Sequence, residues 1–64
     1  MGEHNELRKL LIDRGIKQTW LANRAGITDT ALSEIVTGKR TPTLPVAKRI
    51  ARVLEMRVED IWPE

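Results

Sequence analysis

Residues 18–38 read QTWLANRAGITDTALSEIVTG, and this stretch carries the strongest structural signal in the chain. Its apolar residues recur at helical spacing, and no segment of the chain alternates with the period of a β-strand. The pattern predicts a short helix over 18–25 and a second one over about 28–37. Gly26 suits the turn between them, because that turn needs a positive φ, which glycine adopts without a Cβ penalty. Two helices joined by so short a turn form a helix-turn-helix.

The same stretch has the side chains that a steep crossing of two helices requires. Ala22 is small enough to lie at the point of contact. The apolar side chains expected to bury together and fix the crossing angle are Leu21, Ala25, Ile27, Leu32 and Ile35. The outer face of the second helix then keeps polar side chains that can hydrogen-bond base edges, namely Asp29, Thr30, Ser33 and Glu34.

The rest of the chain predicts three more helices. The first runs over about 5–14, with Asn5 as its cap and Gly15 as its left-handed end. The fourth helix follows Thr43, whose hydroxyl is expected to cap it. Its apolar stripe consists of Leu44, Ala47, Ile50, Ala51 and Leu54. A short fifth helix is expected over about 58–62, which completes an all-α fold.

Length and composition exclude several classes of function. The 64 residues allow one small domain, so we expect a single helix-turn-helix domain over 1–64, with its motif at about 18–37 and residues 1–4 frayed. The chain has no cysteine and one histidine, His4, so we expect no metal site, no cofactor and no enzyme activity. The longest apolar run covers only 10–12, which is far too short to cross a membrane.

Positive charge gathers in the middle of the chain. The formal net charge is +2, but residues 14–49 hold seven basic and two acidic side chains, a net +5, and the two flanks together carry −3. A polyanion would therefore dock on the middle of the chain. An ordinary solvated surface of mixed charge is the alternative interpretation.

From about residue 7 to residue 62 the chain resembles the phage repressor and Cro-like helix-turn-helix family, also called Xre-type. The matching pieces are RGIKQTWLANRAGIT, ALSEIVTGKRTPTL and IARVLEMRVEDIW. The small-residue, glycine and apolar spacings match together in these pieces. The resemblance implies a compact five-helix repressor-like domain, a two-fold dimer, and a third helix that enters the major groove of DNA.

The resemblance also implies which residues contact DNA. Gln18 is expected to meet a backbone phosphate from the start of the second helix. Lys39, Arg40 and Thr41 follow the recognition helix, where the family's loop touches phosphate. Lys17 stands where the family often has a capping residue, and a lysine there makes sense if a phosphate lies nearby. The positions expected to face DNA are Thr28, Asp29, Thr30, Ser33 and Glu34.

Besides Lys17, four residues depart from the family pattern. Asp29 and Glu34 place negative charge on the face meant for DNA, where each carboxylate can accept from a cytosine amino group. Glu55 replaces the usual glycine after the fourth helix, where a left-handed cap costs a non-glycine residue roughly 1 kcal/mol. Arg57 replaces the Ser or Thr that usually caps the fifth helix.

We also expect a second copy of the chain as a partner. A domain of this size is marginally stable alone, and the fourth helix has more apolar surface than one core needs. The side chains expected in the dimer interface are Val46, Val53, Val58 and an exposed Trp62, with a place in the core as the alternative interpretation of Trp62.

Together these features predict a sequence-specific transcription regulator, a dimeric repressor that binds a double-stranded DNA operator. The alternative is an antitoxin-like or adaptor module whose main partner is another protein, which the acidic recognition face and the extra valines favour. The protein is expected in the cytoplasm of a prokaryote, at the nucleoid, encoded by the host, a phage or a plasmid.

Overall fold

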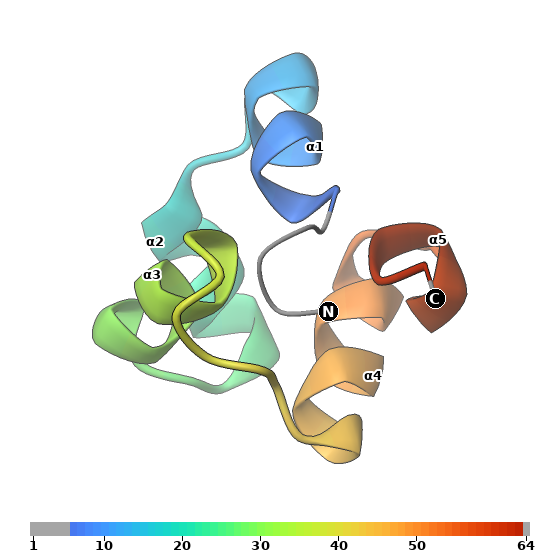
Figure 1. Cartoon of the computed structure of the whole chain (residues 1–64). Coiled ribbons are helices and arrows are strands. Elements are labelled where there is room, and N and C mark those ends of the chain that lie inside the picture. The colour runs from blue at the N-terminus through green and yellow to red at the C-terminus, as the bar shows by residue number, and fades with distance from the viewer. Residues whose placement is uncertain (1–5, 64) are drawn as a thin grey trace.

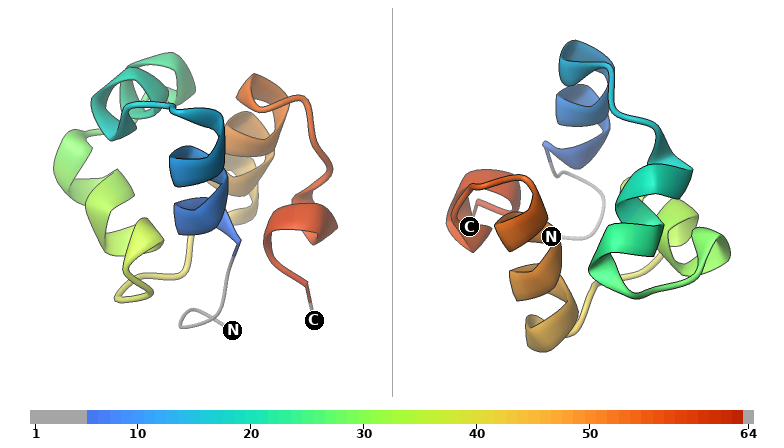
Figure 2. Two further views of the ribbon diagram at one scale, coloured as in Figure 1. Left: turned by 90° about the horizontal axis from the view of Figure 1, so that it is seen from above. Right: turned by 180° about the vertical axis from the view of Figure 1, so that it is seen from behind.

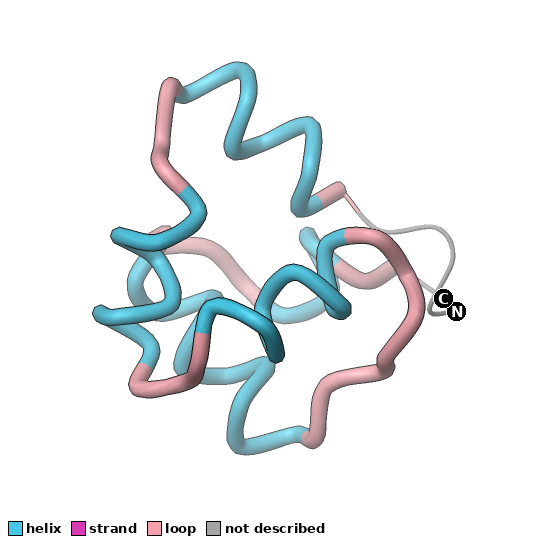
Figure 3. Tube along the Cα trace, turned by 90° about the vertical axis from the view of Figure 1, so that its left-hand side faces the viewer, coloured by secondary structure: helices cyan, strands magenta, loops and turns pink. Residues whose placement is uncertain are grey.

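The computed structural model describes residues 6–63. Over these residues the backbone forms α1 (Leu7–Arg14), α2 (Gln18–Ala25), α3 (Asp29–Val36), α4 (Leu44–Val53) and α5 (Val58–Ile61). The helices are joined by short loops, and the described part of the chain contains no strand (Figure 3). The predicted all-α architecture of five helices is therefore confirmed. None of the described helices is long and apolar enough to span a membrane.

The helices form two pairs, and α1 lies across one end of them. Figure 1 shows α2 and α3 on one side, α4 and α5 on the other, and α1 above both pairs, and the left view of Figure 2 looks down on α1. α2 packs against both α3 and α4, so it joins the two pairs through the core. The guanidinium of Arg14, at the end of α1, donates to the carbonyl of Leu54 over 3.0 Å and ties α1 to the end of α4.

Local capping explains where the central helices begin. The Thr28 hydroxyl oxygen accepts a hydrogen bond from the Ala31 N–H at 3.0 Å, and Thr43 does the same for Val46 at 3.4 Å. Both predicted caps are thus confirmed. The predicted cap Asn5 lies outside the described residues. α1 instead begins after Glu6, whose side chain makes no capping hydrogen bond.

The core draws on every helix. Its buried side chains are Leu7, Leu11, Leu21, Ala22, Ala25, Leu32, Ile35, Ala47, Ile50, Ala51, Leu54, Ile61 and Trp62. Ala22 is fully buried in this set, as expected for the residue at the crossing of two helices. Ile27, the one other residue predicted to bury with this group, is only half-buried and packs against the core from outside.

Two expectations about apolar residues are wrong. Trp62 is not exposed, because it packs into the core next to α5 and keeps only 6% of its surface accessible. The core needs this large side chain to close its C-terminal end in so small a domain. Leu44 does not point inward, since it stands in the first turn of α4, before the helix reaches the core, and is 59% exposed.

Candidate nucleic-acid interface

The recognition helix α3 has one apolar and one polar face. Leu32 and Ile35 point into the core and are 0% and 2% exposed. The residues expected to face DNA lie on the other side of the helix, because successive side chains are turned by about 100°. At the start of the helix the predicted residues are exposed, namely Thr28, Asp29 and Thr30. Near its end they are partly buried, namely Ser33 and Glu34.

The start of α2 offers backbone donors next to this face. Lys17 precedes the helix in an extended conformation, and its side chain makes no capping hydrogen bond. The Leu21 N–H donates to the Lys17 carbonyl at 3.1 Å, so the three N–H groups before Leu21 have no acceptor within the helix. The positive end of the helix dipole lies at the same place. This end of α2 can therefore bind an anion such as a phosphate.

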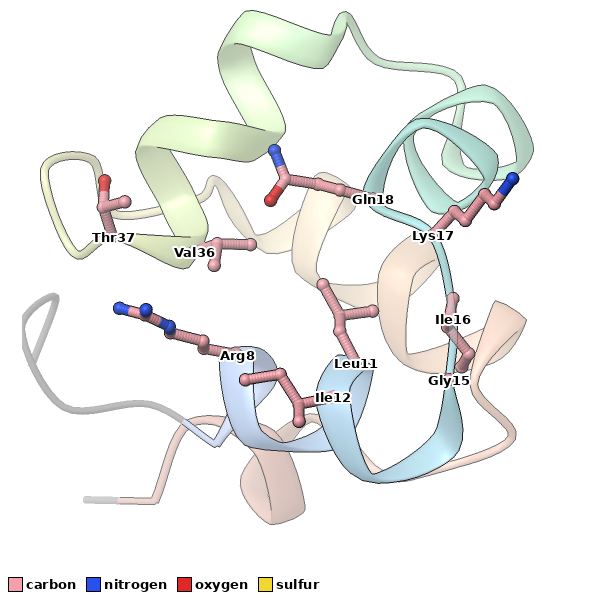
Figure 4. A pocket seen from close by; sticks show the side chains of 9 residues that line it. All are labelled: Arg8, Leu11, Ile12, Gly15, Ile16, Lys17, Gln18, Val36 and Thr37. Carbon is pink, nitrogen blue, oxygen red and sulfur yellow. The ribbon is translucent and has the colours of Figure 1, made fainter.

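A groove of about 620 Å³ opens beside the start of α2. Figure 4 shows the side chains of Arg8 and Gln18 pointing into the space between α1 and α3, while Lys17 points away from it. Apolar side chains form most of the wall, and Ile12 is 69% exposed. The residues that line the groove are Arg8, Leu11, Ile12, Gly15, Ile16, Lys17, Gln18, Val36 and Thr37.

Sequence reasoning missed the contribution of Arg8 to this surface. Arg8 precedes the helix-turn-helix, so only the position of α1 beside α3 could reveal its direction. Trp20 on α2 is 44% exposed, and the guanidinium carbon of Arg24 lies 5.0 Å from the centroid of its ring. A cation over an aromatic face is a favourable contact that keeps both side chains at the surface.

The loop after α3 folds back over the end of the helix. The N–H groups of Lys39 and Arg40 donate to the carbonyl of Glu34 at 2.8 and 3.1 Å. The Thr37 hydroxyl donates to the carbonyl of Ser33 at 2.9 Å. Lys39, Arg40 and Thr41 are all exposed. The structure thus brings the loop cations close to the end of the recognition helix.

One ion pair joins this loop to α3. Oε1 of Glu34 lies 2.6 Å from Nη2 of Arg40, and the two side chains are 36% and 55% exposed. The same oxygen is covered from solvent and accepts no well-aligned hydrogen bond from the described residues. The positive charge of Arg40 therefore compensates the carboxylate mainly by proximity. The sequence predicted that Glu34 faces base edges, and it did not indicate that Arg40 would pair with this carboxylate.

The residues expected in a dimer interface lie on α4 and α5, and Val46 at the start of α4 borders α3 and the loop after it, since it lines one small pocket with Ala31 and Arg40. Val46, Val53 and Val58 are half-buried and pack against the core, and Trp62 belongs to the core itself. The large apolar side chains that are most exposed are instead Ile12, Trp20 and Leu44.

Comparison with known proteins agrees with this arrangement. The family model of the Cro/C1-type HTH DNA-binding domain matches residues 6–62. Comparisons with curated proteins and with solved structures found no match. The match spans nearly the whole described chain and includes α2, α3 and the loop after them. The chain therefore belongs to the Cro/C1-type helix-turn-helix DNA-binding domain family.

Proposed function

We propose that this domain is a sequence-specific transcription regulator that inserts α3 into the major groove of DNA. The observation that carries the proposal is the polar outer face of α3, which lies between two phosphate-binding elements, the start of α2 and the loop after α3. An α-helix fits the width of the major groove, and flanking cations then meet the two walls of phosphates.

The residues of this surface divide by their chemistry. Side chains at the start and centre of α3 reach base edges: Asp29, Thr30 and Ser33. Glu34 lies at the edge of this face, paired with Arg40 of the following loop. The cations and polar groups around them fix the position of the helix through phosphates, which carry no sequence information themselves. This second set is Lys17, Gln18, Thr28, Lys39, Arg40 and Thr41.

We propose further that the regulator is a dimer that represses by occupying its operator in a prokaryotic, phage or plasmid genome. The second copy packs on the side of α4 and α5 that carries Val46, Val53 and Val58. Trp62 contributes little because the core already buries it. Two copies would read half-sites about 34–36 Å apart.

Selection of bound duplexes from a random DNA pool tests this proposal directly. A palindromic consensus with half-sites one helical turn apart is expected, and sedimentation of the complex should give two chains per duplex. Replacing Arg40 with Ala should weaken binding to all sequences nearly alike. A pool that yields no consensus, together with stable co-purification of another protein, would instead favour a module whose main partner is a protein.

A further inference from the structure

Arg40 contacts Glu34 through both its backbone and its side chain, unlike its neighbour Lys39. Its backbone N–H donates to the Glu34 carbonyl at 3.1 Å, and its guanidinium lies 2.6 Å from the Glu34 carboxylate. It also lines a small pocket of about 140 Å³ together with Ala31 and Ile35 of α3. Lys39 shares the backbone hydrogen bond, but its exposed side chain has no contact of this kind with the described residues.

This arrangement places the guanidinium along the flank of α3. Ala31 and Ile35 lie on the side of α3 that borders Thr43 and Val46 at the start of α4, since all four line the same pocket. Glu34 stands between that side and the outer polar face. A helix lying in the major groove has bases in front of its outer face and phosphates along its flanks. The flank is thus where a cation meets the DNA backbone.

The covered Oε1 atom of Glu34 lies beside the guanidinium of Arg40 and away from solvent, so this oxygen is turned away from the bases. A guanidinium has five N–H donors, so one carboxylate contact leaves others for a phosphate oxygen. A cation whose position is fixed before binding loses less side-chain entropy on meeting its target. An exposed ion pair of this kind adds little to the free energy of folding. Its main effect is then on where the guanidinium lies when the domain meets DNA.

We propose that Glu34 is a positioning residue that acts on DNA through Arg40. It holds the guanidinium at the flank of α3 so that Arg40 takes one particular backbone phosphate, and this contact fixes the register of the helix in the groove. The proposal rests on the proposed function, because it concerns how the same surface binds DNA.

The first experiment needs no DNA. The ¹⁵N relaxation of the Arg40 Nε–H group should show a restrained side chain in the wild type and a mobile one, with an order parameter below about 0.6, in Glu34→Ala. Ser33→Ala, on the same helix and next to Glu34, is the matched control and should leave Arg40 restrained. Equal mobility of Arg40 in the wild type and in Glu34→Ala would overturn the proposal.

The second experiment removes the charge of one phosphate at a time. Methylphosphonate is placed at each backbone position of the selected operator, and affinity is measured at one salt concentration. At one position per half-site the wild type should lose about tenfold, as expected for one charged hydrogen bond. Arg40→Ala should lose less than about twofold there, whereas Lys39→Ala should keep the full tenfold loss at that position.

Substitutions at Glu34 then test whether Glu34 fixes the position of the Arg40 guanidinium against that phosphate. In Glu34→Ala the loss at that phosphate should fall to about threefold and smaller losses should spread to neighbouring phosphates. Glu34→Gln keeps an oxygen that can accept from the guanidinium and should give an intermediate pattern. A pattern in Glu34→Ala that matches the wild type would contradict a positioning role.

Two further outcomes separate the possible failures. If Glu34→Ala changes the preferred base while Arg40→Ala keeps it, Glu34 reads the base directly and the positioning role is wrong. If the wild type binds no duplex above background, the proposed function fails and the role on DNA fails with it, even where the relaxation experiment still finds Arg40 held by Glu34.

Discussion

Two turns of this domain share one backbone conformation but differ in the residue that adopts it. After α2, the Gly26 N–H donates to Asn23 and the Ile27 N–H to Ala22, at 3.2 and 3.0 Å. After α4, the N–H groups of Glu55 and Met56 make the equivalent hydrogen bonds to the carbonyls of Arg52 and Ala51, at 3.0 and 2.9 Å. The left-handed residue has a φ of 73° in the first turn and 57° in the second.

The difference separates the two halves of the domain. The turn between α2 and α3 is formed by a glycine and is free of backbone strain, and it sets the angle of the recognition helix. The turn between α4 and α5 places a glutamate in the left-handed region, at a cost of about 1 kcal/mol. The strained turn thus lies away from the helix that we propose to enter DNA, in the half that completes the core. We therefore expect relief of this strain to change stability and to leave DNA binding unchanged.

The largest expected effect concerns the DNA-binding half. If the dimer contacts roughly 6–10 phosphates, its affinity for DNA should fall by about 10³–10⁵ between 50 and 200 mM salt, because each neutralised phosphate releases counterions. Fluorescence anisotropy over a series of salt concentrations measures this slope. Glu55→Gly in the other half should leave the slope unchanged. An affinity that stays nearly constant over this range would contradict the phosphate contacts assigned to α2 and the loop after α3.

The next effect concerns the tryptophan that closes the core. Trp62→Ala should destabilise the domain by about 3–5 kcal/mol, because it leaves a cavity at the end of α5. A domain of this length has a free energy of unfolding of only about 3–10 kcal/mol, so the substitution should remove about a third or more of its stability. Urea unfolding followed by circular dichroism measures the change. Trp20→Ala is the control: its side chain is 44% exposed, and the expected loss is about 1 kcal/mol or less.

These two tryptophans also show how far local sequence signals reach. The helices, the caps Thr28 and Thr43 and the left-handed ends depend on residues within one turn of each other, so the pattern of the chain predicted them. Which side chains close the core depends on how α5 packs against α4, and the exposure of Trp62 was therefore predicted wrongly. No local rule could indicate it.

The candidate site divides in the same way. The polar face of α3 follows from helical periodicity alone, and the family match supports its role in DNA binding. The ion pair between Glu34 and Arg40 depends on the path of the loop that folds back over α3, which spacing in the sequence did not indicate. The direction of Arg8 into the groove beside α2 depends likewise on how α1 packs.

A matched pair of substitutions tests the two left-handed turns. Gly26→Ala should destabilise the domain by about 1 kcal/mol through the positive φ alone, since an added Cβ would meet no atom within 4 Å. Glu55→Gly should stabilise it by about 1 kcal/mol at most, because the gain is reduced by the flexibility of glycine in the unfolded chain. Each change corresponds to a shift of about 4–8 °C in the midpoint of thermal unfolding. Melting temperatures that move in the same direction for both variants would contradict the assignment of strain to Glu55.

The smallest effect lies at the surface of α5. The guanidinium of Arg57 donates a hydrogen bond to the Glu59 carboxylate over 2.9 Å, and this contact lowers the pKa of Glu59. Arg57→Ala should therefore raise the pKa of Glu59 toward its ordinary value.

A carboxyl group with a lowered pKa in the folded state favours folding above its unfolded pKa, about 4.3, and this contribution is lost as the pH falls through the folded pKa. Arg57→Ala should thus slightly lower the stability at pH values above about 4.3 and leave it unchanged in more acidic solution. The effect is small because both side chains are well exposed and salt screens them. Titration of the Glu59 carboxyl carbon by NMR measures the shift, which should shrink at 1 M salt in the wild type. If Glu59 titrates identically in the wild type and in Arg57→Ala, the ion pair is absent in solution, and the start of α5 is then held by Asp60 alone, whose carboxylate accepts from the Arg57 N–H at 3.2 Å.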